Sequence, residues 1–143
     1  LEFYALAQTL DPWPGENYEG TSVLAGAKAA KQKGYVSAYH WADSLDDLIM
    51  GVGYLGPGVM GTWWWSGMMR PATNGAVSPT GYRMGGHAWL VNGVNLRARL
   101  FFCVNSWGEQ WGKGGKFVIT FEDMGQLLAD AGEACFFRET TKR

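Results

Sequence analysis

The sequence predicts an α+β fold, in which two helices come first and an antiparallel β part follows. Before residue 55, apolar residues recur at helical spacing behind serine or threonine caps. From residue 56 onward, short runs rich in aromatic and β-branched residues alternate with turns that contain Gly and Pro. Helices and strands that are segregated along the chain in this way are typical of α+β domains.

The first well-marked helix is predicted to run from a cap at Thr21 or Ser22 to Lys33. The segment 1–10 before it is either the end of a helix or irregular. The buried stripe of the predicted helix is expected to consist of Val23, Leu24, Ala27 and Ala30.

A second helix is predicted to begin after Ser44, following an extended segment over residues 35–41. Asp46 and Asp47 lie in its first turn, where negative charge is favourable beside the free N–H groups. The apolar face of this helix is expected to be Leu45, Leu48, Ile49 and Val52.

The β part is expected to consist of a strand, a Gly- and Pro-rich loop, a hairpin, another strand, a short helix and a last strand. The predicted bounds are 57–64 for the first strand, 66–81 for the loop, 88–92 and 100–104 for the hairpin, 116–121, 122–131 for the helix, and 134–137.

The turn over residues 93–98 sets the register of the predicted hairpin. Pairing about a centre near Leu96 places His87 opposite Asn105, with Cα atoms about 5 Å apart. An amide oxygen beside an imidazole accepts a ring N–H, and so fixes the tautomer and orientation that a general base requires. The pair therefore has the chemistry of the base and its orienting group in a nucleophile–base–orienter triad.

These residues resemble the papain-like cysteine peptidases, and the stretch 18–22 with the alanine-rich helix after it is similar to bacterial and phage members of that family. The resemblance is carried by Gly86-His87-Ala88, by Asn105-Ser106-Trp107-Gly108 and by a second Trp-Gly at Trp111-Gly112. It covers nearly the whole chain, but it corresponds only to the later part of the family domain.

The resemblance implies a papain-like fold, with residues 1–143 as a single partial domain. Residues 45–138 would form the barrel-like, antiparallel right-hand domain, and residues 1–40 would be a remnant of the helical left-hand domain. It also implies that His87 and Asn105 occupy catalytic positions, that Trp107 covers the bond between them, and that neither a metal nor an organic cofactor is needed.

The resemblance further implies a substrate pocket formed by small residues. Gly61 and Ala88 match positions that wall this pocket in the family, and Gly86 lies beside them. Their small size would leave room for a bulky apolar side chain of the substrate.

The family's nucleophile is a cysteine that lies well before the histidine, whereas the first cysteine of this sequence is Cys103. Cys103 is expected to face Trp89 in the hairpin, diagonal to His87 at roughly 7–8 Å, as a buried strand residue rather than a replacement nucleophile. Cys135 is expected to be a core residue. The nucleophile would then belong to a separate chain, a cleaved piece or a deleted segment.

Two functions of different classes follow. The chain is either the His/Asn-bearing portion of a cysteine peptidase, completed by a Cys-bearing segment, or a non-catalytic papain-like structural or interaction module, such as a phage particle component. The expected partners are a peptide or protein substrate, together with a Cys-bearing N-terminal segment or another subunit that covers the His87 and Asn105 face. A carbohydrate-binding module is a third reading that rests only on the tryptophan content.

The run Trp63-Trp64-Trp65, with Met68 and Met69, has two readings. Alternation along a strand exposes at least one of these tryptophans, which would form a groove wall or an assembly contact. The other reading is core packing under a covering loop. His40 has no comparable partner and is interpreted as structural.

The composition restricts the remaining classes. The 143 residues suffice for one domain, and a net charge of −1 with scattered Lys and Arg predicts neither a nucleic-acid nor a membrane partner. Two cysteines are too few for a disulfide framework. The sequence from Leu1 lacks the basic region of a signal peptide, so we expect a cytoplasmic or virion-associated protein that is not secreted by its own signal.

Overall fold

The computed structural model describes residues 2–13 and 19–141. The chain divides into two compact units, of which unit 1 comprises residues 1–40 and 137–143 and unit 2 comprises residues 41–136. In chain order, the elements are α1 (Glu2–Leu10), α2 (Val23–Gln32), β1 (Val36–Trp41), α3 (Leu45–Tyr54), β2 (Gly58–Trp65), the 3-10 helix η1 (Ser66–Met68), β3 (Arg83–Asn95), β4 (Leu100–Val104), β5 (Lys116–Thr120), α4 (Phe121–Ala129) and β6 (Glu133–Glu139).

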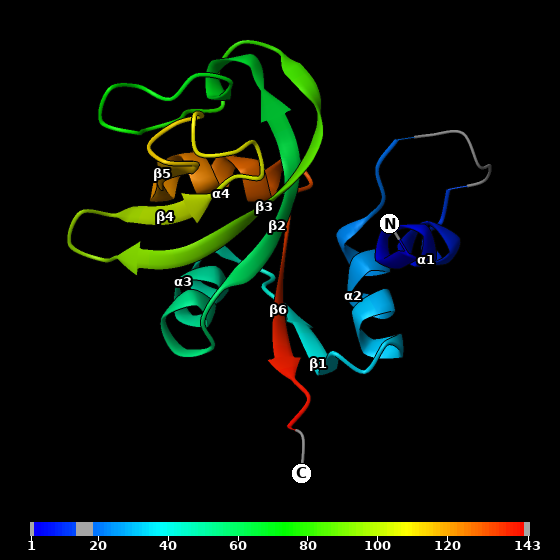
Figure 1. Cartoon of the computed structure of the whole chain (residues 1–143). Coiled ribbons are helices and arrows are strands. Elements are labelled where there is room, and N and C mark those ends of the chain that lie inside the picture. Colours follow the sequence, from blue (N-terminus) through cyan, green and yellow to red (C-terminus); the bar gives the residue numbers. More distant parts are fainter. Residues whose placement is uncertain (1, 14–18, 142–143) are drawn as a thin grey trace. The chain divides into compact units, whose positions relative to one another are not determined.

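The strands form one sheet, in the order β1-β6-β2-β3-β4-β5 (Figure 1). The pairs β2–β3, β2–β6, β3–β4 and β4–β5 are antiparallel. The predicted α+β class is therefore confirmed, with α1 and α2 before the first strand.

Unit 1 contains a small core in which alanines of α2 meet α1. Ala25 and Ala29, one helical turn apart, pack with Ala7, and Ser22 caps α2 by accepting the backbone N–H of Ala25 at 3.0 Å. The predicted stripe was only partly right. Ala27 is buried, but Leu24 is 36% exposed, and Val23 and Ala30 are only half-buried. Small side chains allow α1 to approach closely, so the alanines form the covered face.

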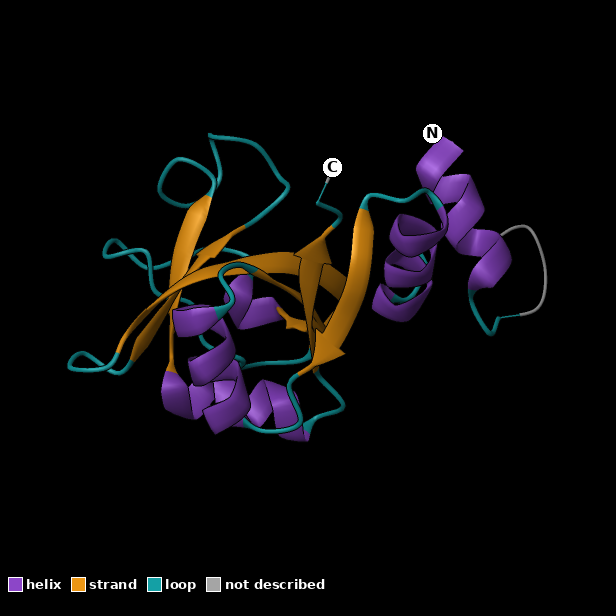
Figure 2. Cartoon of the chain, turned by 90° about the horizontal axis from the view of Figure 1, so that it is seen from below, coloured by secondary structure: helices purple, strands orange, loops and turns teal. Residues whose placement is uncertain are grey.

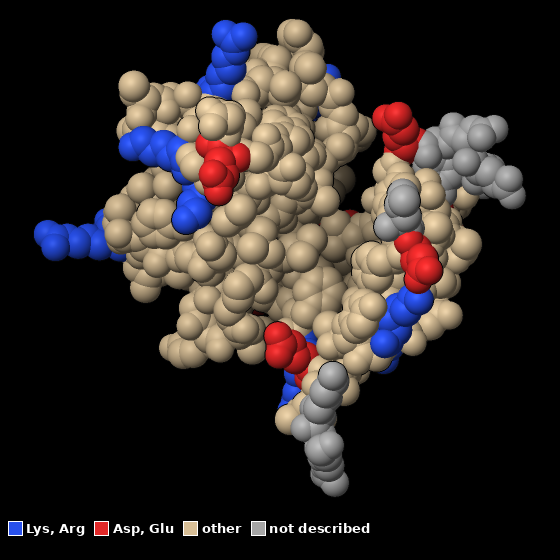
Figure 3. Space-filling view, in the orientation of Figure 1, with Lys and Arg blue, Asp and Glu red and all other residues tan. Residues whose placement is uncertain are grey.

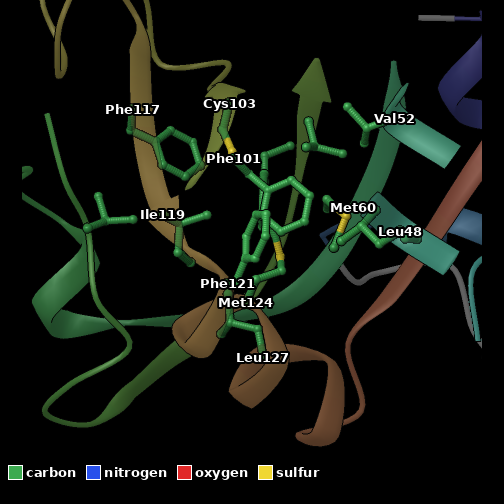
Figure 4. Close-up of a cluster of buried hydrophobic side chains, with 14 of the residues drawn as sticks. Leu48, Val52, Met60, Phe101, Cys103, Phe117, Ile119, Phe121, Met124 and Leu127 are labelled. Carbon is green, nitrogen blue, oxygen red and sulfur yellow. The ribbon is translucent and has the colours of Figure 1, made fainter. Parts of the chain in front are cut away.

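Unit 2 holds the main hydrophobic core (Figure 4). Helices α3 and α4 lie on the same side of its strands (Figure 2). Ser44 and Thr120 cap these helices by accepting the backbone N–H groups of Asp47 and Asp123, each at 3.0 Å. The largest fully buried side chains of the core are Phe101, Leu48, Met60, Met68, Ile119, Met124 and Leu127.

The hairpin differs from the prediction in its turn and register. Strand β3 continues to Asn95, whose side chain accepts the backbone N–H of Ala98 at 2.9 Å and closes the turn. The pairing starts from Asn95 opposite Leu100, and an irregularity between Val91 and Gly93 then moves it by one residue, so that Cys103 faces Val91 and not Trp89. The predicted turn over 93–98 was therefore wrong, because the asparagine rather than Gly93 begins the reversal.

The loops that follow β2 and β4 lie beside each other in unit 2 (Figure 1). The Trp111 indole N–H donates to the carbonyl oxygen of Met69 at 2.9 Å. Residue Val77 pairs with β5, because its backbone N–H donates to the Val118 carbonyl at 3.0 Å. The first bond joins the two loops, and the second joins the loop after β2 to strand β5.

Candidate functional site

His87 lies inside β3, where it faces Thr62 of β2. The strand was predicted to begin at residue 88, but it begins at Arg83, so His87 lies within β3 rather than just before it. Two residues along β3, Trp89 points to the same face and its indole N–H donates to the buried Thr62 hydroxyl at 3.0 Å. This bond holds the local backbone that positions the half-buried imidazole.

Asn105 reaches His87 from just beyond the end of β4. The ring Nε2 of His87 and the Oδ1 of Asn105 are 2.8 Å apart, although the two residues are not cross-strand partners. The backbone N–H of Asn105 donates to the Gly115 carbonyl at 2.9 Å, so the following loop holds the asparagine in place. The expected side-chain contact is present, but the loop rather than the ladder register produces it.

A second hydrogen bond determines which amide atom faces the imidazole. The backbone N–H of Ser106 lies 2.8 Å from Asn105 Oδ1, and a backbone N–H can only donate. The atom that it contacts must therefore be the oxygen. Since the same oxygen faces His87, Nε2 carries the ring hydrogen and donates it. The other ring nitrogen, Nδ1, is left as the basic atom of the neutral imidazole.

Aromatic rings enclose the imidazole on two sides. Trp107 is tilted against His87 with ring centres 4.7 Å apart, and Trp64 meets it in a T-shaped contact at 4.9 Å. Trp64 is 2% exposed, whereas Trp107 is 40% exposed. Trp107 therefore covers the pair from the solvent side, and Trp64 supports it from the core.

Trp64 and the Ser106 N–H are the site groups that the sequence analysis did not identify. The tryptophan run was predicted to have alternating faces, and the structure exposes 38% of Trp63 while it buries Trp64. Alternation alone did not reveal which of the three tryptophans points inward. Trp63 instead lies under the Arg83 guanidinium, 5.1 Å from the ring centre.

The three small residues of the expected substrate pocket lie along β2 and β3. Gly61 faces Ala88 across the ladder, and Gly86 faces Trp63. These positions alternate with Thr62 and His87, so they belong to the opposite face of the two strands. Ala88 and Gly86 are exposed, and a Cβ at Gly86 would meet nothing within 4 Å. Their role in substrate binding remains a prediction.

Both cysteines are buried and lie away from the imidazole. Cys103 is 1% exposed and faces Val91 and Phe117 on its two neighbouring strands. Burial raises the pKa of the Cys103 thiol well above its usual range. Burial, together with the negative charge of Glu133, raises the pKa of Cys135 to about 12. A nucleophile must be a thiolate, so neither cysteine has the environment of one.

Within residues 2–13 and 19–141, no group of three or more His, Cys, Asp or Glu side chains is arranged to hold a metal ion. None of the helices in those residues combines the length and apolar character that a membrane span needs.

Solved structures similar to this chain include cysteine proteases. Xylellain from Xylella fastidiosa has a TM-score of 0.62 at 22% identity over 85% of this chain, and the match covers 46% of xylellain. A procathepsin B from Trypanosoma congolense has a TM-score of 0.57 at 17% identity, over 75% of this chain and 37% of its own. A cysteine protease of Carica candamarcensis has a TM-score of 0.53 at 18% identity, over 73% of this chain and 50% of its own.

These likenesses show that the chain has a papain-like fold, and they confirm the predicted fold class. The chain spans half or less of the length of each of these three proteases. No protein-family model matches the sequence, and no curated protein matches it.

Proposed function

We propose that this chain is the His/Asn-bearing portion of a papain-like cysteine peptidase, which hydrolyses peptide bonds when a Cys-bearing segment completes it. One observation carries the proposal. The Asn105 oxygen accepts hydrogen bonds from the Ser106 backbone N–H and from His87 Nε2, each at 2.8 Å, beneath the ring of Trp107. That arrangement orients the imidazole of His87, and it leaves the basic nitrogen, Nδ1, on the side of the ring away from Asn105.

The chemistry of the completed site follows from the hydrogen on Nε2. Nδ1 of His87 would take the proton of an incoming cysteine thiol, giving a thiolate and an imidazolium. The thiolate attacks the peptide carbonyl, and the imidazolium returns its proton to the departing amine. In the second half, the neutral imidazole takes a proton from water, whose hydroxide releases the acyl group and regenerates the thiol.

Asn105 and Trp107 would act on this cycle through His87. The Asn105 oxygen holds the ring while it gains and loses its proton, so that Nδ1 faces the thiol throughout. Trp107 limits the access of water to the His87–Asn105 bond, and a hydrogen bond in a drier surrounding is stronger. Both are positioning residues in this proposal.

The proposal needs two partners. A Cys-bearing N-terminal segment, or another subunit, would cover the face that carries His87, Asn105 and Trp107, and a peptide or protein would be the substrate. Large apolar side chains on unit 2, such as Met84 at 50% exposure and Trp107 at 40%, leave surface for such a contact. Gly61, Gly86 and Ala88 would contact the substrate.

Complementation tests the proposal. Residues 1–143 are combined, in one polypeptide or two, with the portion of a papain-like protease that this chain does not cover, for instance that of xylellain. Hydrolysis of a fluorogenic peptide and labelling by a thiol-alkylating peptide probe are measured. We expect both to appear, and His87→Ala to lower hydrolysis by about 10²- to 10⁴-fold. His40→Ala is the matched control, since His40 is exposed and lies outside the site.

Two results would contradict the proposal. One is hydrolysis that persists unchanged in His87→Ala. The other is hydrolysis by residues 1–143 alone that disappears in Cys103→Ser, which would make Cys103 the nucleophile despite its burial.

The alternative function is a non-catalytic papain-like structural or interaction module, for example in a phage particle. The observation that favours it is the burial of both cysteines away from His87. Under this alternative, a complemented protein that folds and binds its partner hydrolyses nothing, and His87→Ala leaves partner binding unchanged.

A further inference from the structure

A cleft of about 370 Å³ lies in unit 2, between the loop after β2 and the loop after β4. Met69, Pro71 and Trp111 give it an apolar wall, and Thr73 and Gln110 add a hydroxyl and an amide. Two cationic side chains, Arg70 and Lys113, also line it, one from each loop.

The walls of the cleft are held by hydrogen bonds within and between the two loops. The Trp111 indole N–H donates to the Met69 carbonyl at 2.9 Å and connects them. Backbone bonds from Lys113 to Lys116 at 2.9 Å, and from Ala72 to Ala76 at 2.8 Å, close each loop on itself. Such loops present their side chains with little ordering cost on binding.

The two cations have no acidic partner within the described residues. The ion pairs found there are Arg83–Asp130 and Arg99–Glu122, so neither Arg70 nor Lys113 is neutralised. The acidic residue nearest in sequence, Glu109, does not line the cleft. Two unpaired cations and no lining carboxylate make this an electropositive cleft.

We propose that the cleft binds a carboxylate carried by a peptide, either an Asp or Glu side chain or the C-terminal carboxylate. A guanidinium can pair with both carboxylate oxygens, and the Lys113 ammonium adds a second charge. Thr73 and Gln110 supply further donors. The apolar wall of Met69, Pro71 and Trp111 receives the hydrocarbon part of the ligand.

The position of the cleft connects this site to the proposed function, on which the substrate assignment rests. The ring of Trp111 meets Trp107 at 5.4 Å, and Trp107 meets His87 at 4.7 Å. About three residues of extended chain cover that path from His87 to the Trp111 wall of the cleft. We therefore expect a peptide that reacts at His87 to carry its carboxylate about three residues from the scissile bond.

Binding to residues 1–143 tests the cleft without any catalysis. Short peptides with Glu, the matched Gln, a free C-terminal carboxylate or an amidated terminus are titrated and followed by NMR shifts of the cleft residues. We expect the Glu peptide, the free-carboxylate peptide or both to bind at least about tenfold more tightly than the neutral counterpart. The two comparisons distinguish the two sources of carboxylate.

Substitutions of Arg70 and Lys113 test whether these two side chains cause the preference for the charged peptide. Arg70→Gln and Lys113→Gln should each remove most of the preference for the charged peptide, while Arg97→Gln, on the exposed β3–β4 turn, should keep it. Arg70→Glu should shift the preference toward a Lys-bearing peptide. Equal binding of charged and neutral peptides, or an unchanged preference in the Arg70→Gln, Lys113→Gln double variant, would overturn the proposal.

The completed enzyme supplies a separate readout. Among peptide substrates with one Glu moved along the sequence, kcat/KM should peak with the Glu within about three residues of the cleaved bond, and Arg70→Gln should flatten that profile. If the cleft binds carboxylates but the completed protein hydrolyses nothing, the proposed peptidase function is wrong, while the proposed carboxylate site still holds. If kcat/KM does not depend on the position of the Glu and the binding assay shows no preference for a carboxylate, the proposed carboxylate site is wrong, while the proposed peptidase function still holds.

Discussion

Trp64 meets the imidazole of His87 in a T-shaped contact, with ring centres 4.9 Å apart and planes inclined by 70°. Trp64 also touches Trp89, Trp107 and Phe117, and it is 2% exposed. Since Trp64 belongs to the hydrophobic core of unit 2, the core supports the candidate site from one side.

We predict that Trp64→Ala destabilises the protein by about 3–5 kcal/mol, because it leaves a large cavity among fixed rings. Trp63→Ala is the matched control. Trp63 is 38% exposed and its main neighbour is the Arg83 guanidinium, so its loss should cost under about 1 kcal/mol. Urea unfolding measures both. Similar costs for the two variants would contradict the assignment of Trp64 to the core.

We predict that Asn105→Ala allows the neutral imidazole of His87 to adopt both of its tautomers. In the parent protein, the Asn105 oxygen requires the hydrogen on Nε2. Without that acceptor, the neutral imidazole should become a mixture of Nε2–H and Nδ1–H forms. Nitrogen-15 shifts of the imidazole, recorded at a pH where the ring is neutral, measure the ratio. A mixture already present in the parent protein would show that the bond does not select the tautomer.

Gly51 and Gly53 of α3 should respond in opposite directions to alanine. A Cβ at Gly51 would lie 2.4 Å from the buried ring of Phe136, whereas a Cβ at Gly53 would meet nothing within 4 Å. Gly51→Ala should therefore cost about 1–3 kcal/mol through overpacking. Gly53→Ala should stabilise the protein by about 0.5–1 kcal/mol, because it removes a helical glycine. Thermal unfolding of the two variants provides the comparison.

The buried thiols should make the protein less stable in alkali. The pKa of Cys135 is raised by burial to about 12, and that of Cys103 is raised also, against about 8.5 for a free thiol. Above about pH 8.5 the unfolded chain loses thiol protons that the native state keeps, so stability falls as pH rises toward the native pKa.

Each thiol can remove up to about 1.4 kcal/mol of stability per pH unit in that range. Urea unfolding at several alkaline pH values measures the slope. Cys135→Ala should make it less steep than in the parent protein, while Cys103 keeps its own share. An unchanged slope in that variant would mean that Cys135 does not remain protonated in the native state.

Local signals in the sequence were sufficient for much of the fold. Ser22 and Ser44 cap their helices as predicted, because a cap depends only on the next three residues. The His87–Asn105 contact was predicted through a register that the structure does not have. The pair still meets, because the backbone N–H of Asn105 donates to the Gly115 carbonyl and holds the asparagine beside His87. The irregularity near Asn92 could not be read, because it depends on packing across several strands.

The electropositive cleft could not be predicted from the sequence for a related reason. Arg70 and Lys113 are more than forty positions apart, and their loops meet only in the folded chain, where the Trp111 indole N–H donates to the Met69 carbonyl. Figure 3 shows basic and acidic side chains spread among uncharged surface, so charge counting could not have singled out these two.

The place of β6 in the sheet has a consequence for synthesis of the protein. This strand is the last strand of the sheet to be synthesised, yet it lies between β1 and β2 in the strand order. Until residue 139 has emerged, the backbone of Gly58–Gly61, which later pairs with β6, presents free N–H and C=O groups to any passing strand. The nascent chain is therefore most vulnerable to misassembly after β2 and before β6 has been synthesised, and a chain that stops before residue 133 would keep that strand edge unpaired.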